Sequence, residues 1–119
     1  LISIERLDAI VERTRFGGGE LVKLFGNGSA YYAPAASAIE MAESYIKDKK
    51  RILPCAAYCD GEFGINGLFV GVPTVLGKNG VERIVEIELN AEEQSLMDES
   101  ASHVADLVET VKTTFPELA

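Results

Sequence analysis

The sequence contains one histidine, His103, and this side chain is the first candidate for acid–base chemistry. A catalytic base needs both a partner and a substrate-accessible cleft. Asp98, Glu99 and Asp106 lie within helical reach of the imidazole, and an ordinary surface ion pair accounts for a histidine in this setting. We therefore do not expect His103 to be catalytic.

Two cysteines, Cys55 and Cys59, could supply thiols for redox or metal chemistry. On a strand, residues four apart lie on one face at roughly 13 Å, whereas a disulfide needs Cα atoms within about 7 Å. Their C-x-x-x-C spacing also differs from the C-x-x-C of redox and zinc motifs. We expect two small buried hydrophobic residues in a reducing compartment.

Glycines cluster at two places where a phosphate could bind. The run at residues 17–19 does not follow a strand pattern, so we expect a helix break there and no phosphate loop. Gly26 and Gly28 precede a helix, and this spacing alone is a weak indication of an anion site. Tyr31 and Tyr32 lack basic neighbours, which favours packing over base stacking. No Cys/His cluster has metal-ligand spacing, and no serine lies in a G-x-S-x-G turn.

The 119 residues carry 11 Lys and Arg against 19 Asp and Glu, a formal net charge of −8, and 47% of them are hydrophobic. This composition is typical of one soluble globular domain, and its acidity argues against nucleic acid or an anionic membrane as partner. No apolar run approaches the ~18 residues that span a bilayer, and residues 1–6 do not resemble a signal peptide. Because the chain opens with Leu1 just before a helix pattern, we expect an interior piece or a processed product of a longer protein.

Helical periodicity dominates the first part of the chain. Ser3 is a candidate cap for an apolar stripe over residues 4–16. Three glycines at residues 17–19 carry a penalty of about 1 kcal/mol each, so we expect them to interrupt the helix. Residues 20–25 again have a helical pattern, and the glycines of residues 26–28 end it.

A second long helix is predicted to begin at residue 29 or 31 and to continue to residue 49. Small residues crowd its first half, and they would let the helix approach another backbone closely. Pro34 has no N–H, so it fits only in the first turn or at a kink. Basic residues gather at the C-terminal end, where positive charge complements the helix dipole.

Three strands are predicted to follow, at residues 52–59, 68–76 and 81–89. Residues 77–80 contain Asn-Gly and join the last two strands as a hairpin. The glycine-rich connection of residues 60–67 is also short. Because neither connection can hold a crossover helix, we expect an antiparallel sheet.

The last predicted helix begins after Asn90, with Glu93 placed to complete a capping box, and Pro116 ends it. One apolar face recurs at helical spacing over about five turns. Its members are Met97, Ala101, Val104, Val108, Val111 and Phe115. The chain is therefore expected to form one α+β domain, with about three antiparallel strands packed with three to four helices.

Four stretches stand out because they are long and lie in a recognisable order. Residues 28–45 read GSAYYAPAASAIEMAESY, and the others are residues 6–15 with 17–20, 50–58, and 70–77 with 80–84. They resemble the C-terminal domain of NAD-dependent malate dehydrogenases, of the bacterial type that is similar to lactate dehydrogenase. The resemblance covers essentially the whole chain, and it implies the fold of that domain.

The departures from the family concern its chemistry. The chain has neither the G-x-G-x-x-G turn of the family's dinucleotide-binding half nor the Gly-Gly-His-Gly-Asp-type motif of its catalytic histidine. The family's substrate arginines also lie upstream, so none of these roles passes to Arg13, Arg15, Arg51 or His103. The resemblance implies that residues 1–119 form the C-terminal, substrate-side part of such an enzyme, without its Rossmann half and inactive alone.

The resemblance also implies a role for the start of the small-residue helix, which in the family lines the substrate and nicotinamide pocket. This puts Ser29, Ala30 and Pro34 on the pocket wall. Small side chains leave room for a small dicarboxylate, and Pro34 offers a flat apolar surface to a nicotinamide ring. Tight helix packing is the alternative interpretation of the same residues. No catalytic residue and no metal ligand is assigned.

The remaining expectations follow from the same family. The reaction is reversible hydride transfer between malate and NAD, giving oxaloacetate, with NAD bound mainly by the Rossmann half. We expect a cytoplasmic homo-oligomer, a dimer or tetramer, with apolar surface bare on the first two helices. Two alternatives remain open: a stand-alone non-catalytic interaction or assembly domain, and the same part of a lactate dehydrogenase.

Overall fold

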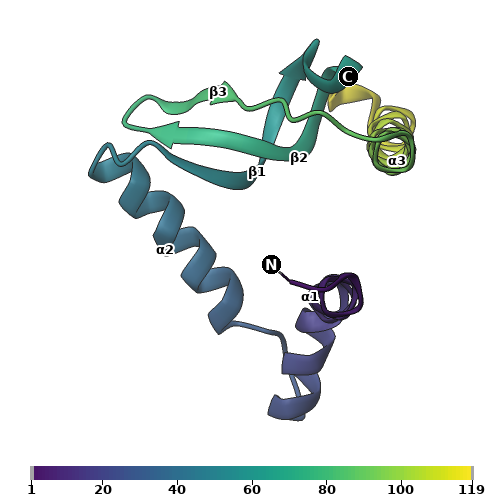
Figure 1. Ribbon diagram of the computed structural model, residues 1–119. Coiled ribbons are helices and arrows are strands. Elements are labelled where there is room, and N and C mark those ends of the chain that lie inside the picture. Colours follow the sequence, from purple (N-terminus) through teal and green to yellow (C-terminus); the bar gives the residue numbers. More distant parts are fainter. Residues whose placement is uncertain (1, 119) are drawn as a thin grey trace. The chain divides into compact units, whose positions relative to one another are not determined.

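The computed structural model describes residues 2–118. The chain forms two compact units, Leu1–Glu40 and Met41–Ala119. The first unit holds helix α1 (Ile4–Phe25) and the start of helix α2 (Tyr32–Ile46), and the second holds the sheet and helix α3 (Ala91–Thr114) (Figure 1). The described residues form three α-helices and one three-stranded sheet, which confirms the predicted α+β class.

Helix α1 is continuous, so the prediction that residues 17–19 interrupt it is wrong. Ser3 caps the first turn by accepting from the Arg6 N–H at 3.4 Å, and Gly26 ends the helix in the left-handed conformation. Glycine lowers helix propensity but, unlike proline, keeps its N–H and can adopt helical angles. The penalty therefore weakens the middle of a well-capped helix without breaking it. Arg13 and Glu20 also pair across the glycines, at 2.9 and 3.0 Å.

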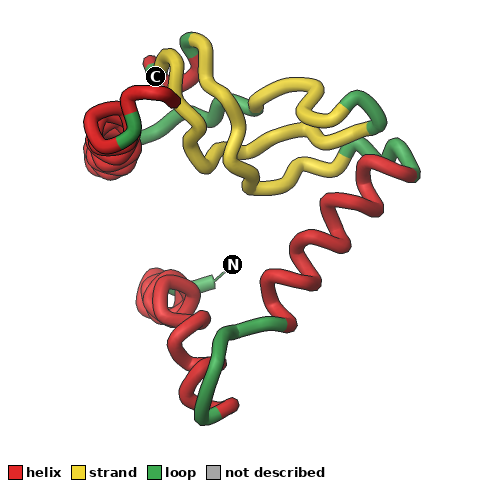
Figure 2. The backbone as a smooth tube through the Cα atoms, turned by 180° about the vertical axis from the view of Figure 1, so that it is seen from behind, coloured by secondary structure: helices red, strands yellow, loops and turns green. Residues whose placement is uncertain are grey.

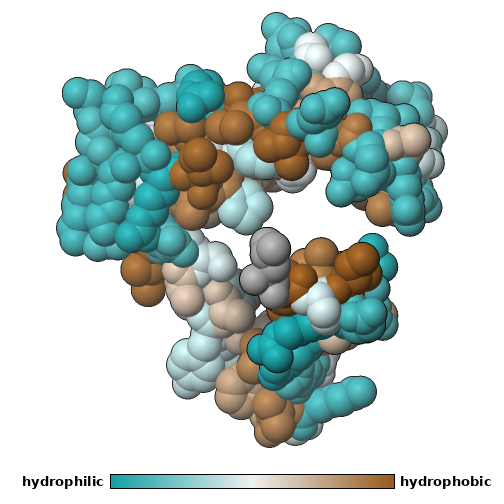
Figure 3. Space-filling model, in the orientation of Figure 1, coloured by the Kyte–Doolittle hydropathy of each residue, from teal (hydrophilic) through white to brown (hydrophobic). Residues whose placement is uncertain are grey.

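Helix α1 buries none of its residues. Its large apolar side chains, which include the predicted stripe of Ile4, Leu7, Ile10 and Val11, remain between about two-fifths and three-quarters exposed; the others are Phe16, Leu24 and Phe25. Hydrophobic side chains are visible on the surface of this helix in Figure 3. Within its unit, this stripe is a bare apolar surface.

Helix α2 begins at Tyr32 and places Pro34 in its first turn, as predicted. It ends at Ile46, three residues earlier than expected. Asp48 and Lys50 adopt positive φ angles of 48° and 50°, and the Lys49 N–H donates to the Ser44 carbonyl at 2.9 Å. Left-handed residues turn the chain out of the helix at this point.

The sheet has the order β1-β2-β3 and is antiparallel throughout, as predicted. Strand β1 spans Arg51–Asp60, β2 spans Asn66–Gly77 and β3 spans Gly80–Ile84 (Figure 2). A 3-10 turn at Glu62–Gly64 lies between the first two strands.

The β2–β3 hairpin closes where the Asn-Gly pair predicted it. Gly77 pairs with Gly80, whose φ of 85° lies in the left-handed region that this turn requires. Strand β3 ends at Ile84, five residues before the predicted end. The Val85 N–H still donates to the Pro73 carbonyl at 2.8 Å, but Pro73 has no N–H to return, so the ladder stops there.

One face of the β1–β2 hairpin forms the core of the second unit. Cys55, Ala57 and Cys59 alternate with exposed residues along β1, and Val70 and Val72 of β2 lie on the same buried face. Both cysteines are free and buried, which confirms their expected burial. The opposite face of the hairpin is exposed and carries an edge-on aromatic pair, Tyr58 and Phe69, with ring centroids 5.4 Å apart.

Helix α3 begins with the predicted capping box. The Asn90 side chain accepts from the Glu92 and Glu93 N–H groups, and the Glu93 carboxylate accepts from the Asn90 N–H at 2.9 Å. Met97 and Ala101 pack against the sheet core. The later members of the predicted face, Val108, Val111 and Phe115, are 39–49% exposed, so only the first half of the stripe is covered. None of the described helices combines the length and apolar character that crossing a membrane requires.

Candidate functional site

The three predicted pocket residues lie where helix α2 begins. Ser29 and Ala30 belong to the connection of residues 26–31 between α1 and α2, and Pro34 lies in the first turn of α2. Ser29 and Pro34 are exposed, and Ala30 is half-buried. The structure therefore brings these three small residues to one end of one helix, with Ser29 and Pro34 open to solvent.

The backbone of this connection has an unusual course. Gly26 and Gly28 have φ angles of 77° and 79°, and Tyr31 has a positive φ of 25°. The Ala30 carbonyl accepts from the Ala33 N–H at 3.2 Å, and the Tyr31 carbonyl accepts from the Ala35 N–H at 3.1 Å. The first turn of α2 is thus built on the residues that follow Ser29.

An open groove of about 850 Å³ lies between α1 and α2 within the first unit. Its walls include Gly17, Gly18 and Leu21 of α1, and Ala33 and Ser37 of α2. Ala33 directly precedes Pro34, so the groove runs up to the predicted wall. None of the three predicted residues lines it. Sequence reasoning missed the groove because α1 was expected to break at these glycines.

His103 is exposed on α3 and forms no ion pair with any described residue, so the expected ion pair is absent. Asp98 instead accepts from the Gln94 amide at 2.8 Å, one turn earlier. No group of three potential metal-ligating side chains forms among residues 2–118. Burial raises the pKa of the Cys59 thiol, with a smaller contribution from Glu62, which keeps it protonated.

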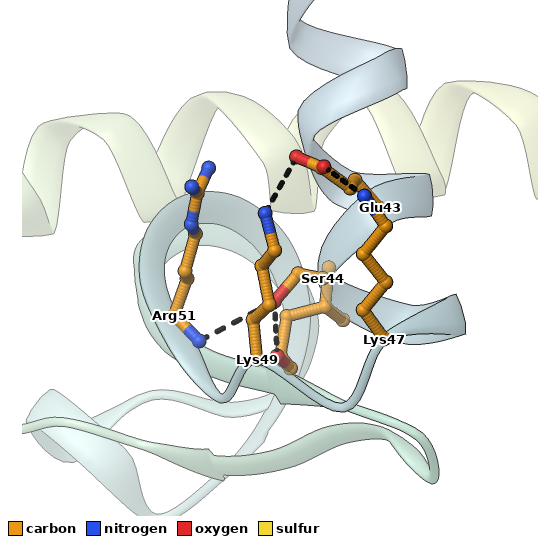
Figure 4. A network of polar contacts seen from close by, with 6 residues as sticks. Glu43, Ser44, Lys47, Lys49 and Arg51 are labelled. Carbon is orange, nitrogen blue, oxygen red and sulfur yellow. Dashed lines mark hydrogen bonds and ion pairs between the residues drawn. The ribbon is translucent and has the colours of Figure 1, made fainter.

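A polar cluster joins the end of α2 to the sheet, and sequence reasoning missed it. Ser44 is fully buried; its hydroxyl donates to the Leu76 carbonyl at 2.6 Å and accepts from the Arg51 N–H at 3.3 Å (Figure 4). Glu43 accepts from Lys47 at 2.6 Å and from Lys49 at 2.8 Å. These bonds lower the Glu43 pKa from 4.5 to about 2.

The turn after α2 also holds the β2–β3 hairpin tip. Asp48 accepts from the Lys78 N–H at 3.0 Å, and Lys50 pairs with Glu82 at 3.3 Å. A Cβ on Gly77 would lie 2.8 Å from the Asp48 carboxylate and 2.6 Å from that of Glu82, so a larger residue there would displace both carboxylates. We call residues 47–50 with residues 77–82 the α2–β1 corner. It is a structural element: Lys50 pairs with Glu82, and Lys47 and Lys49 pair with Glu43.

The fold defines an α+β domain in which helices accompany one three-stranded antiparallel sheet. Residues 2–115 match the family model of the lactate/malate dehydrogenase, alpha/beta C-terminal domain. The chain belongs to this family. The malate dehydrogenase of Cereibacter sphaeroides is 59% identical over 115 residues, which are 97% of this chain and 36% of that protein.

Solved structures of the family have the same fold. The malate dehydrogenase of Salinibacter ruber has a TM-score of 0.89 and 50% identity, covering 100% of this chain and 39% of that one. The lactate dehydrogenase of Cryptosporidium parvum, complexed with lactic acid and nicotinamide adenine dinucleotide, has a TM-score of 0.85 and 44% identity, covering 93% and 35%. The chain thus spans about a third of the length of the proteins it matches.

Proposed function

We propose that this chain is the substrate-side, C-terminal part of an NAD-dependent malate dehydrogenase. The observation that carries the proposal is 59% identity to a malate dehydrogenase over 97% of the chain. The reaction is reversible hydride transfer between malate and NAD, which gives oxaloacetate and NADH. NAD supplies the hydride acceptor, and the protein supplies binding and orientation.

The contribution of this chain is a wall of the pocket at the start of α2. Ser29 and Pro34 are exposed and Ala30 carries only a methyl group, so these side chains leave room for a small dicarboxylate. Pro34 lacks an N–H and presents an apolar ring suited to one face of the nicotinamide. These residues are suited to shape the pocket and to orient the substrate. Apart from the Ser29 hydroxyl, none of their side chains has a proton to transfer.

The proton-transfer and nucleotide-binding groups would come from a Rossmann half. His103 is unsuited to the base role because it stands exposed on α3, without a carboxylate to orient it among the described residues. We therefore expect the 119-residue chain to show no turnover of NADH with oxaloacetate. Measurable turnover by the pure chain would contradict this division of labour.

A chimaera tests the proposal directly. Residues 2–115 would replace the matching segment of the Cereibacter sphaeroides malate dehydrogenase, and NADH absorbance would be followed with oxaloacetate. We expect activity, and we expect Ala30→Leu to lower kcat/KM by at least about tenfold because the larger side chain fills the pocket. Ala36→Leu, at an exposed position of helix α2, is the matched control and should leave kcat/KM within about twofold. An inactive wild-type chimaera would overturn the proposal.

Lactate is the second candidate substrate, because the Cryptosporidium parvum lactate dehydrogenase is also close to this fold. The chimaera inherits its remaining substrate contacts from the Cereibacter protein, so a second chimaera with the Cryptosporidium enzyme is needed. Comparing oxaloacetate with pyruvate in both then separates the contribution of this chain. A preference for oxaloacetate that persists in both chimaeras would favour malate.

We also propose that the whole enzyme is a cytoplasmic homo-oligomer. The bare stripe of α1 supports association, and the two free buried thiols suit a reducing compartment. The chain alone should therefore self-associate as its concentration rises. A strictly monomeric sedimentation profile at high concentration would count against this part of the proposal.

A further inference from the structure

The connection of residues 26–31 contains a tyrosine in an unfavourable backbone conformation. Tyr31 has a positive φ of 25°, a region in which the Cβ of an ordinary residue is crowded by its own backbone. Gly26 and Gly28 also have positive φ angles, but glycine adopts these at little cost. Strain at a bulky residue persists only where its surroundings fix it. Contacts of the ring and of the backbone therefore hold Tyr31 in this conformation.

The Tyr31 side chain lies back over Gly28. A Cβ placed on Gly28 would meet the Tyr31 hydroxyl and would lie 2.8 Å from the Cε2 and Cζ atoms of the ring. A Cβ placed on Gly26 would meet nothing within 4 Å. Gly28 therefore leaves the room that the ring occupies, and the contact closes a loop around the two residues between them, Ser29 and Ala30.

The two ends of this loop are anchored as well. The rings of Phe25 and Tyr32, which flank the connection, lie with centroids 5.8 Å apart. The Tyr31 carbonyl accepts the Ala35 N–H at 3.1 Å, so the backbone of Tyr31 is tied to the first turn of α2. A residue held at both its backbone and its ring can set the course of the segment before it.

We propose that Tyr31 is a positioning residue, whose ring on Gly28 holds Ser29 and Ala30 in the shape that binds a small dicarboxylate. This inference rests on the proposed function and adds a residue to it. A preset wall spares the substrate the cost of ordering the loop. Losing the contact should therefore weaken substrate binding, while the transferring groups keep their places.

The chain offers a matched pair of substitutions for the test. Gly26→Ala and Gly28→Ala both force alanine into a left-handed position of the same connection, but only the second displaces the Tyr31 ring. In the active chimaera, we expect Gly28→Ala and Tyr31→Ala to raise the KM for oxaloacetate about tenfold with kcat within about twofold. Combining them should add little, and Gly26→Ala should leave KM near the wild-type value.

Tyr31→Phe keeps the ring and should restore a near-wild-type KM. A purely structural role would lower the amount of folded enzyme, and thus kcat, in Tyr31→Ala and Gly26→Ala alike, without this split between KM and kcat. Hydrogen exchange of the Ser29 and Ala30 amides in the 119-residue chain gives a readout independent of activity. Exchange should quicken in Gly28→Ala and not in Gly26→Ala.

The outcomes separate the two proposals. An active wild-type chimaera in which Gly28→Ala and Gly26→Ala have the same KM overturns the role of Tyr31 and leaves the proposed function standing. Equal hydrogen exchange in these two variants also overturns it. An inactive wild-type chimaera overturns the proposed function and, with it, the substrate-binding role of Tyr31.

Discussion

Replacing Ser44 by alanine should destabilise the second unit measurably. The hydroxyl is fully buried, donates to the Leu76 carbonyl at 2.6 Å and accepts from the Arg51 N–H at 3.3 Å. Each intramolecular hydrogen bond contributes about 1 kcal/mol net, and the longer of these two contributes less. Alanine returns up to about 0.5 kcal/mol of helix propensity. Because the substitution also leaves the buried Leu76 carbonyl without this donor, the net loss expected is about 1.5 kcal/mol.

Helix α2 also provides the control for this substitution. The Ser37 hydroxyl donates to the Ala33 carbonyl at 3.1 Å, but Ser37 is exposed and water can replace the bond. Ser37→Ala should thus be neutral or slightly stabilising. Urea denaturation followed by circular dichroism gives the free energy of unfolding of both variants. In thermal unfolding, a loss of about 1.5 kcal/mol corresponds to a Tm about 6 °C lower.

Equal stability of the two variants would contradict the role of the Ser44 hydroxyl. If the free energies of unfolding of Ser44→Ala and Ser37→Ala lie within about 0.5 kcal/mol of each other, the buried hydroxyl contributes no more to stability than the exposed one. The contact between the end of α2 and the sheet would then depend on the strand ladder and on the ion pairs. Exposed ion pairs contribute little, so such a result would shift the weight to the ladder.

Three further predictions concern pH, helix propensity and thiol access. The pKa of Glu43 is lowered to about 2 by Lys47 and Lys49, so the folded state releases this proton more readily than the unfolded state. Stability should fall as the pH drops from 4.5 towards 2, and Glu43→Gln should flatten that part of the curve; an unchanged acid limb would contradict it. A Cβ on Gly18 meets nothing within 4 Å, so Gly18→Ala should raise the helix content and stabilise α1 by up to about 1 kcal/mol, and lost helicity by circular dichroism would refute this. Cys59 is 0% exposed, so iodoacetamide should label it only on unfolding, and labelling at equal rates with and without urea would refute its burial.

Local signals were sufficient where one short segment decides the structure. The capping box at Asn90, the serine cap at Ser3 and the Asn-Gly hairpin were predicted because their partners lie within four residues. The alternation of Cys55 and Cys59 on one strand face was predicted for the same reason. In each case the residues that make the interaction are close together in the sequence.

Predictions failed in two situations. In one, the deciding contact comes from a distant part of the sequence; in the other, residues of low helix propensity weaken a helix without ending it. Residues 17–19 weaken α1 but do not end it, because only the loss of an N–H or a left-handed turn forces an end. Strand β3 stops where Pro73, on the neighbouring strand, offers no N–H. Ser44 resembles any helical serine, and its acceptor lies 32 residues away.

The proposed pocket wall rests on the resemblance, and the backbone geometry of this segment was not predictable. Ser29 and Ala30 directly precede helix α2 and Pro34 lies in its first turn, yet nothing in their sequence reveals the positive φ of Tyr31. The contact between Tyr31 and Gly28 depends on a backbone conformation that tyrosine seldom adopts. Sequence patterns describe what residues prefer, and this residue is held against its preference.

The α2–β1 corner also affects how the protein can be engineered. The hairpin tip at Lys78 is exposed and short, and it looks like a natural position for an affinity tag or a fluorescent label. An insertion there would pull the Lys78 N–H from Asp48 and open the packing around Gly77. Glu88, exposed in the connection beyond the end of the ladder, is a safer attachment point. For grafting a reporter, the bonds that a tip makes matter more than its accessibility.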